Sequence, residues 1–261
     1  MATRKHRYTP CYHPQEKFRN CTFINCSCIR SGMRCEPACA CYKPSYTTLD
    51  KEQRSTANDY IYSSRCSNAF IGCCCSEQQC LIESCTCRMK NQECNPKSCS
   101  CCTESENGQC GNMMLQKLDA AFSQGKRPFN LPKLQLFSTK SAGYGVKAVE
   151  KIMAGQFIQE YVGERIDNNE SERRGLICDS EALSYIFNCN EDEAIDSQSY
   201  GNISRFINHS NQPNCQTTVL YVNGEDRVAI FAIQNINIGE ELNFDYNYSP
   251  THQEIHFSCC N

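Results

Sequence analysis

Cysteine is concentrated in one part of this chain. Nineteen of the 24 cysteines in the 261 residues fall between Cys11 and Cys110. This asymmetry predicts two regions, one held together by metal ions or disulfides and one ordinary globular region. No apolar run approaches the roughly 20 residues of a membrane span. The first seven residues have no apolar stretch behind them, so we expect no secretory signal. Dense cysteines are then interpreted as thiolate metal ligands.

Pairs of cysteines separated by a single residue recur in this region. Single-zinc fingers usually use pairs separated by two residues, because that loop lets both sulfurs reach one tetrahedral ion. The tighter spacing suits clusters in which one sulfur bridges two ions. A disulfide knot or scattered free thiols is the alternative interpretation. The pairs are Cys26 and Cys28, Cys39 and Cys41, Cys73 and Cys75, and Cys85 and Cys87.

The rest of the chain predicts a mainly β region with few helices. The spacing of residues 113–122 predicts a connecting helix, and the charged segment 168–184 predicts a helical insert. Residues 42–65 are polar and free of cysteine, which indicates a surface loop. Alternation and β-branched residues predict short strands at 134–137, 145–149, 156–162, 217–222 and 227–232.

Three motifs in this β region carry chemistry. They are Gly143-Tyr-Gly145, the string Arg-Phe-Ile-Asn-His-Ser within 201–210, and Phe-Asp-Tyr ending at Tyr246. The glycine motif alone would more often be a plain turn. In this order the three resemble the signature motifs of the SET-domain lysine methyltransferases.

Further segments narrow the resemblance to the Enhancer-of-zeste type, the catalytic subunit of Polycomb repressive complex two. They are 154–164, 173–175, 187–188, 208–215 and 244–249, together with the cysteine region, which resembles the CXC region of that family. The resemblance implies a mainly β SET fold of short curled sheets with a pseudoknot. It also implies transfer of methyl groups from S-adenosylmethionine to a lysine of histone H3, most likely lysine 27, and transcriptional repression in the nucleus.

The resemblance also divides the chain. It implies a loop-rich CXC zinc-cluster domain at 1–110 with an inserted loop at 42–65, and a linker helix region at 111–131. The SET domain follows at 132–250. In the tail, 251–261, Cys259 and Cys260 are adjacent and no further cysteine follows, so a post-SET zinc site is absent or truncated.

The resemblance implies six zinc ions, three in each half of the CXC region. Three tetrahedral ions need twelve bonds, and nine ligands supply twelve when three of them bridge. Cys74 and Cys101 are left over. The first half offers Cys11, His13, Cys21, Cys26, Cys28, Cys35, Cys39, Cys41 and Cys66, and the second offers Cys73, Cys75, Cys80, Cys85, Cys87, Cys94, Cys99, Cys102 and Cys110.

Tyr246 is the leading catalytic candidate, because a hydroxyl there can orient the lysine amine. A tyrosine capping a strand in the core is the alternative. Tyr161 and Phe244 are implied to control how many methyl groups the amine can carry. The implied lysine channel comprises Tyr161, Phe187, Phe244, Tyr246 and Tyr248. Such aromatic residues are more often core, so this assignment depends on the motif match. Cys178, Cys189 and Cys215 are interpreted as packing residues.

The implied cofactor site is built around the glycine motif and the Asn-His pair. Glycine lets the backbone approach a cofactor without a Cβ, and Tyr144 stands where this family has Trp. A polar turn before Pro213 is the alternative for the Asn-His pair. The implied residues are Ala142, Gly143, Tyr144, Gly145, Ser184, Tyr185, Phe206, Asn208 and His209.

The implied partners are the histone H3 tail, the nucleosome and accessory subunits of a Polycomb-type complex, with possible DNA contact and no membrane. A net charge of −3 gives no general case for nucleic-acid binding. Two other functions stay open. One is a SET enzyme acting on lysine 9 or 36, because residues 93–99 also resemble a cysteine segment that precedes those domains. The other is a non-catalytic chromatin-binding module.

Overall fold

The computed structural model describes the two regions as two compact units. One comprises Met1–Gln116 with Tyr221–Glu225, and the other Lys117–Leu220 with Asp226–Asn261. The inserted loop at 42–65 and the tail at 251–261 lie outside the described residues. Within the described ranges, no helix is long and apolar enough to cross a membrane. The described residues are 21, 26–30, 34–35, 39, 68, 70, 72–75, 80, 85–96, 99, 102, 110–126, 131–139, 143–181 and 185–247.

The first unit has little regular structure where it is described. It contains α1 (Ser27–Arg30), the short 3-10 helix η3 (Arg88–Lys90) and the first turn of α3 (Met114–Ser123). Its buried groups are mostly cysteines, joined by single aromatic residues such as Phe70 and Tyr221. Because aliphatic side chains are few, the sulfurs occupy the place of a hydrophobic core.

Helix α3 begins at a buried carboxylate. The backbone N–H groups of Leu115 and Gln116 donate to Glu93 Oε1 at 2.6 Å and Oε2 at 3.2 Å. The N–H groups of the first helical turn have no acceptor within the helix, and they form the positive end of the helix dipole. Glu93 therefore caps the helix, and it directly precedes Cys94 in the sequence.

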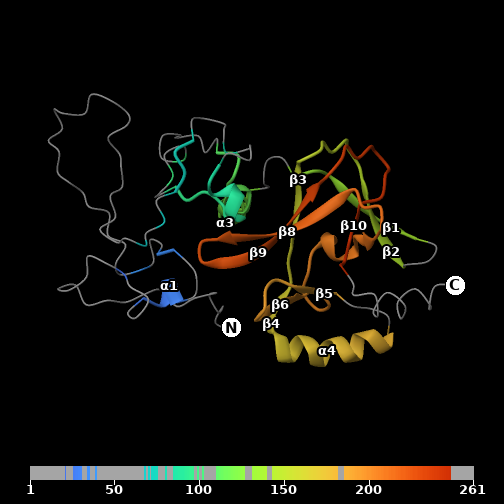
Figure 1. Ribbon diagram of the computed structural model, residues 1–261. Helices are drawn as coiled ribbons and strands as arrows, with labels where there is room; N and C mark the ends of the chain where they lie inside the picture. Colours follow the sequence, from blue (N-terminus) through green and yellow to red (C-terminus); the bar gives the residue numbers. More distant parts are fainter. Residues whose placement is uncertain are drawn as a thin grey trace. The chain divides into compact units, whose positions relative to one another are not determined.

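The second unit is built from small sheets (Figure 1). Strands β1 (Leu134–Ser138) and β2 (Tyr144–Ala148) form an antiparallel pair. In a three-stranded sheet of order β3-β9-β8, β9 (Glu225–Ala232) lies between β3 (Phe157–Tyr161) and β8 (Cys215–Val222). Another sheet has the order β4-β6-β5, formed by Glu164–Asp167, Glu193–Asp196 and Ile186–Asn188.

A two-residue turn joins β8 to β9. Asn223 and Gly224 both have positive φ, at 50° and 93°. Asn-Gly is the favoured pair for such a turn, because its twist matches the twist of the flanking strands. The tip of this hairpin is the segment Tyr221–Glu225 that belongs to the first unit. There the Tyr221 N–H donates to Asn91 O at 2.8 Å, and its carbonyl accepts the Glu93 N–H at 3.1 Å.

The core of the second unit is aliphatic, as alternation along the strands predicts. Cys189 and Cys215 belong to this core, which confirms that they are packing residues. The side chain of Cys178 lies outside the described residues. The fully buried aliphatic side chains include Val146, Ile152, Ile158, Ile207, Val228, Ile230, Ile236 and Leu242.

Helix α4 (Asn168–Glu181) is held by charge and lies beside the β4-β6-β5 sheet (Figure 1). The Arg174 guanidinium contacts Glu164 at 2.7 Å, Glu170 at 2.7 Å and the buried Asp196 at 2.6 Å. These hydrogen bonds raise the pKa of Arg174 above its ordinary value. Arg174 therefore joins the helix to the first and middle strands of the sheet.

The prediction of a mainly β region with few helices is confirmed for the described residues. Helices at 113–122 and 168–184 and all five predicted strands are present, with ends shifted by a few residues. The sequence interpretation missed the short strands β4, β5 and β6. It also missed β7 (Asn208–His209), β10 (Asn243–Phe244) and the 3-10 helix η4 (Ile203–Phe206). Strands of two to four residues are too short to show a period of two.

Candidate active site and cysteine clusters

A parallel pairing joins the second and third motifs. Strand β7 pairs with β10, which places Asn208 opposite Asn243 and His209 opposite Phe244. The Ser210 N–H donates to Phe244 O at 3.2 Å. Residues about 35 positions apart in the sequence therefore share one short ladder, and Tyr246 lies two residues after the end of β10.

Tyr246 is held at its backbone and at its hydroxyl. The hydroxyl donates to Ile207 O at 2.7 Å, and the backbone N–H donates to His209 Nδ1 at 3.1 Å. Because Nδ1 accepts, a neutral His209 carries its proton on Nε2, which lies 3.1 Å from Asn211 Oδ1. The tyrosine ring packs against Phe244 and His209, with centroids 4.9 and 5.4 Å away.

A second aromatic pair belongs to the same core cluster. The rings of Tyr161 and Phe187 lie 5.6 Å apart, and the Tyr161 hydroxyl donates to Tyr185 O at 2.8 Å. Tyr161 and Phe244 are buried, and Phe187 and Tyr246 are partly buried against them. Four of the five residues predicted for the lysine channel are thus in one cluster. The fifth, Tyr248, lies outside the described residues.

The two glycines of the first motif have different roles. Gly143 has φ +71°, and a Cβ built on it would meet nothing within 4 Å. A Cβ on Gly145 would come within 2.6 Å of Glu241 Oε1. Gly143 therefore meets a backbone requirement beside open space, whereas Gly145 is required by close packing.

Asn208 connects the first motif to the second. Its Nδ2 donates to Tyr144 O at 3.2 Å and to Glu241 Oε1 at 2.9 Å. The Tyr144 ring, 53% exposed, meets the edge of Phe206 at 5.9 Å. An exposed aromatic ring beside open backbone can pack against a planar or cationic ligand. Ala142 and Ser184 lie outside the described residues.

An arginine supports the remaining aromatic residues. The Arg205 guanidinium lies 4.7 Å from the ring centre of Phe206 and 5.8 Å from that of Tyr185. Its Nη1 donates to Ser197 O at 2.9 Å. Arg205 stands inside the second motif, yet its role on the rings was not foreseen, because nothing in the string indicates which way it points.

Asn214 is a second residue that the sequence interpretation missed. Its buried side chain donates to Glu241 O at 2.7 Å and accepts the Asn243 N–H at 2.9 Å. It therefore fixes the backbone that leads into β10. The roles of Ile207 and Glu241 were missed as well. Ile207 acts through its backbone carbonyl, which no side-chain pattern reveals, and Glu241 is one of two adjacent acidic residues that the sequence does not distinguish.

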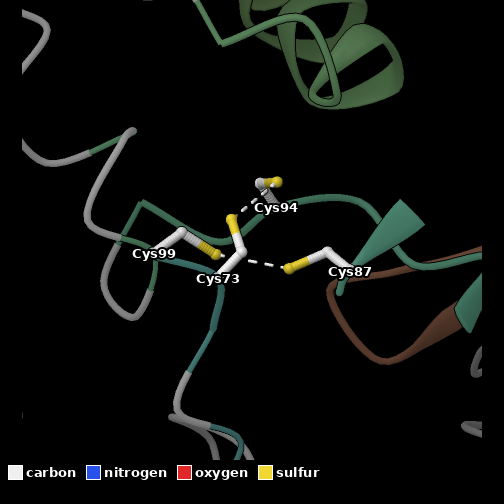
Figure 2. Close-up of side chains that lie close together, drawn as sticks. All are labelled: Cys73, Cys87, Cys94 and Cys99. Carbon is white, nitrogen blue, oxygen red and sulfur yellow. Dashed lines mark hydrogen bonds between the residues drawn. The ribbon is translucent and has the colours of Figure 1, made fainter. Parts of the chain in front are cut away.

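In the first unit, buried sulfurs gather at metal-ligand distances. Cys73, Cys87, Cys94 and Cys99 form one group (Figure 2), and Cys73, Cys80, Cys85 and Cys94 another. Three-cysteine groups are Cys21, Cys26 and Cys35; Cys28, Cys35 and Cys39; and Cys94, Cys102 and Cys110. Cys74 is exposed. Cys11, His13, Cys41, Cys66 and Cys101 lie outside the described residues, and Cys75 belongs to none of these groups.

The sulfur separations distinguish metal ligands from disulfides. The Cys73–Cys94 and Cys87–Cys99 pairs are 3.7 and 3.6 Å apart (Figure 2). Cys28 and Cys39 are 3.5 Å apart. A disulfide needs about 2.05 Å. A tetrahedral zinc with Zn–S bonds of about 2.3 Å places its sulfurs about 3.8 Å apart. Among the described cysteines, the spacing is that of a metal site.

Several of these sulfurs belong to more than one group. Cys94 is in three groups, and Cys73 and Cys35 are each in two. Hydrogen bonds from Cys87 and Cys94 lower the pKa of Cys73 to about 5. Hydrogen bonds from Cys102 and Cys94 lower the pKa of Cys110 to about 2. The partners of these hydrogen bonds show the opposite effect, because hydrogen bonds from Cys73 raise the pKa of Cys87 and hydrogen bonds from Cys102 and Cys110 raise the pKa of Cys94. Protons are therefore shared unevenly among the packed thiols.

Known proteins are similar to this chain over the SET region and over most of its length. Residues 143–247 match the SET domain family. The chain is 36% identical over 239 residues to histone-lysine N-methyltransferase mes-2 of Caenorhabditis elegans, covering 90% of this chain and 27% of that protein. It is 31% identical over 259 residues to histone-lysine N-methyltransferase EZA1 of Arabidopsis thaliana, covering 94% of this chain and 26% of that protein. The chain spans about a quarter of the length of these curated relatives.

Solved structures of Polycomb repressive complex 2 are also similar. One, of an active complex in the basal state, has a TM-score of 0.68 at 30% identity, covering 92% of this chain and 30% of that chain. Another, an autoinhibited complex described as bound to S-adenosylmethionine, has a TM-score of 0.70 at 28% identity, covering 96% and 30%.

The fold and the three joined motifs therefore define a SET-domain protein. Its homologues are histone-lysine methyltransferases of the Enhancer-of-zeste type, so the resemblance found in the sequence is confirmed.

Proposed function

We propose that the chain methylates a lysine side chain of histone H3, using S-adenosylmethionine, and that lysine 27 is the target. Its relatives are named histone-lysine N-methyltransferases, and a similar structure is described as bound to S-adenosylmethionine. The observation that carries the proposal is the placement of Tyr246. Its hydroxyl is fixed on Ile207 O beside an aromatic wall.

The aromatic cluster would act on the charge of the lysine. Free lysine has a pKa near 10.4, so the reactive neutral amine is scarce at pH 7. A channel lined by Tyr161, Phe187, Phe244 and Tyr246 removes water from the amine. Desolvation penalises the ammonium form and lowers the pKa of the substrate. The walls also hold the amine in line for attack, which contributes to the rate.

The two tyrosine hydroxyls would act as acceptors. Tyr246 gives its single proton to Ile207 O, and Tyr161 gives its proton to Tyr185 O. A further partner of either oxygen must therefore donate. An amine N–H or the electron-poor methyl group is such a donor. Tyr246 would then stabilise the positive charge around the transferring methyl, and Tyr161 would hold the less methylated amine.

S-adenosylmethionine supplies an electrophilic methyl group on a sulfonium. Gly143, Tyr144, Gly145, Asn208 and His209 would hold it, together with Phe206, Tyr185 and the two predicted residues outside the described ranges, Ala142 and Ser184. Asn208 would act by fixing Tyr144 O, and His209 by fixing the backbone of Tyr246.

The cysteine groups would hold six zinc ions, three in each half. The sulfur separations and the shared sulfurs of the second half support clusters of this kind. Metal binding would then supply the folding free energy that a core poor in aliphatic residues does not.

The whole protein would act in the nucleus as part of a Polycomb-type complex, on nucleosomes, to repress transcription. Similar solved chains belong to such complexes. In this proposal the chain binds accessory subunits, and its cysteine unit contacts nucleosomal DNA.

Methylation of recombinant nucleosomes, followed by mass spectrometry of H3, tests the function. The chain is assayed alone and with accessory subunits, on nucleosomes with lysine 9, 27 or 36 replaced by Arg. We expect loss of methylation only with the lysine 27 replacement. Loss with lysine 9 or 36 instead would assign the other SET types. Absence of both methylation and calorimetric S-adenosylmethionine binding would support a non-catalytic module.

A further inference from the structure

Two asparagines contact the cysteine clusters in the same way. The Cys35 N–H donates to Asn68 O at 2.8 Å, and Asn68 Nδ2 donates to Cys35 Sγ at 3.4 Å. The Cys94 N–H donates to Asn112 O at 2.8 Å, and Asn112 Nδ2 donates to Cys94 Sγ at 3.3 Å. Each asparagine therefore holds one cysteine at its backbone and at its sulfur.

The two cysteines occupy equivalent positions of an internal repeat. Sulfur contacts repeat as well, with Cys26–Cys35 at 3.6 Å matching Cys85–Cys94 at 3.9 Å. Each asparagine stands two residues after a cysteine, Cys66 or Cys110. The intervals of 5, 2 and 7 residues that separate Cys21, Cys26, Cys28 and Cys35 recur between Cys80, Cys85, Cys87 and Cys94.

These two cysteines are also among those shared between sulfur groups. Cys35 belongs to two sulfur groups and Cys94 to three, and both are fully buried. The eight thiolates predicted for the first half and the nine predicted for the second carry more negative charge than three divalent ions neutralise. An N–H donor aimed at a shared thiolate stabilises that excess charge where water is excluded. It also fixes the direction of the sulfur, which has to face more than one ion.

We propose that Asn68 and Asn112 are positioning residues for the metal clusters, each donating a side-chain N–H to the thiolate that adjacent ions share. The inference rests on the proposal that the clusters hold zinc. The orientation of Asn112 supports it, because Nδ2 also donates to Gln92 O at 2.9 Å. Its two hydrogens thus meet a carbonyl and a sulfur, and the opposite amide orientation would place oxygen against both acceptors.

The test compares Asn112→Ala with Gln116→Ala in the whole 261-residue chain. Gln116 Nε2 donates to Cys94 O at 2.8 Å, so the control touches the same cysteine without touching its sulfur. Zinc transfer to a metallochromic chelator is timed. We expect Asn112→Ala to release zinc about 10–100-fold faster than the unaltered chain, and Gln116→Ala to stay within a few-fold.

Cobalt substitution gives a readout that general loosening would not move. Removing an N–H donor raises the energy of the sulfur lone pairs. The sulfur-to-cobalt charge-transfer band should therefore move to longer wavelength in Asn112→Ala and Asn68→Ala, but not in Gln116→Ala. Equal release rates and unchanged bands in all variants would overturn the inference.

A measurement on the unaltered chain keeps the inference testable if neither variant folds. With ¹¹³Cd in the clusters, a scalar coupling between the Asn112 side-chain amide protons and the metal is expected through the N–H···S bond. Its absence would contradict the inference. Zinc content separates the two proposals: no zinc in the unaltered chain overturns both, whereas full zinc content without the coupling overturns only the role of the asparagines.

Discussion

The hydroxyl of Tyr246 donates a 2.7 Å hydrogen bond to the backbone carbonyl of Ile207. The Ile207 side chain is fully buried in the core of the second unit. The Tyr246 hydroxyl is therefore positioned by the aliphatic packing of Ile207, the residue directly before the Asn-His pair. The same hydrogen bond commits the only proton of the hydroxyl and leaves its oxygen to act as an acceptor.

Replacing Tyr246 with Phe should lower turnover about 100-fold or more, because it removes the oxygen that we propose stabilises the transferring methyl. Stability should fall by only about 1 kcal/mol, the usual net contribution of one hydrogen bond. Steady-state methylation of nucleosomes measures the first effect and thermal unfolding the second. S-adenosylmethionine affinity, measured by calorimetry, should stay nearly unchanged. Near-normal turnover would remove Tyr246 from its assigned role.

Exchanging hydroxyls in the aromatic cluster should change the product in opposite directions. Phe244→Tyr adds an oxygen beside Tyr246 and should shift products toward monomethyl-lysine. Tyr161→Phe frees space and removes the acceptor that we propose holds the less methylated amine, so it should shift products toward higher methylation. Mass spectrometry on substrates carrying zero, one or two methyl groups distinguishes the variants. If both lose every methylation state in equal proportion, the channel has been assigned to the wrong residues.

Metal removal should unfold the cysteine unit. We expect about six zinc ions per chain by elemental analysis, from the bond count for two three-zinc clusters. Chelation should abolish the protection of amides near Cys94 against hydrogen exchange while leaving amides of the β3-β9-β8 sheet protected. About two zinc ions per chain, or disulfides found by mass spectrometry under non-reducing conditions, would contradict this prediction.

The sequence predicted the long elements and the motifs, but not the contacts between motifs. Strands β8 and β9 have clear alternation and an Asn-Gly turn, so local physics is enough to find them. The β7–β10 pairing involves two residues on each side and was not foreseen, because its register depends on tertiary packing. The prediction for Tyr246 came from its motif, whereas the hydrogen-bond acceptor of its hydroxyl, Ile207 O, is a backbone atom that no side-chain pattern reveals.

The same limit applies to the cysteine unit. Counting ligands identified most of the sulfurs that gather, because thiolates at close spacing have few other uses. It did not identify Asn68, Asn112 or Glu93. An amide aimed at a sulfur, or a carboxylate capping a helix 21 residues later, can be recognised only once the chain path is known.

Thiol labelling should separate the buried core cysteines from an exposed one. Burial raises the pKa of Cys189 and of Cys215 to about 12. In the folded chain at pH 8 both are therefore neutral thiols and should resist maleimide, whereas the exposed Cys74 should react rapidly. Because the folded pKa is raised, the stability contributed by each neutral thiol is present below pH 8.5 and is lost as pH rises toward 12. Peptide mapping that finds Cys189 modified as fast as Cys74 would contradict the core placement.

The two arms of Arg227 should contribute very differently to stability. The guanidinium contacts the buried Glu160 at 2.6 and 2.7 Å and the half-exposed Asp119 at 2.6 and 3.0 Å. Burial acts to lower the pKa of Arg227, and the bonds to Glu160 and Asp119 outweigh it and raise the pKa above its ordinary value.

Arg227→Leu leaves the Glu160 carboxylate buried without its partner, so the free energy of unfolding should fall by about 3–5 kcal/mol. Asp119→Asn breaks only the exposed arm and should cost less than about 1 kcal/mol. Denaturant unfolding of both variants, with Glu160→Gln combined with Arg227→Leu as the rescue, measures the difference. Equal losses from the two single variants would mean that burial of Glu160 does not control this part of the fold.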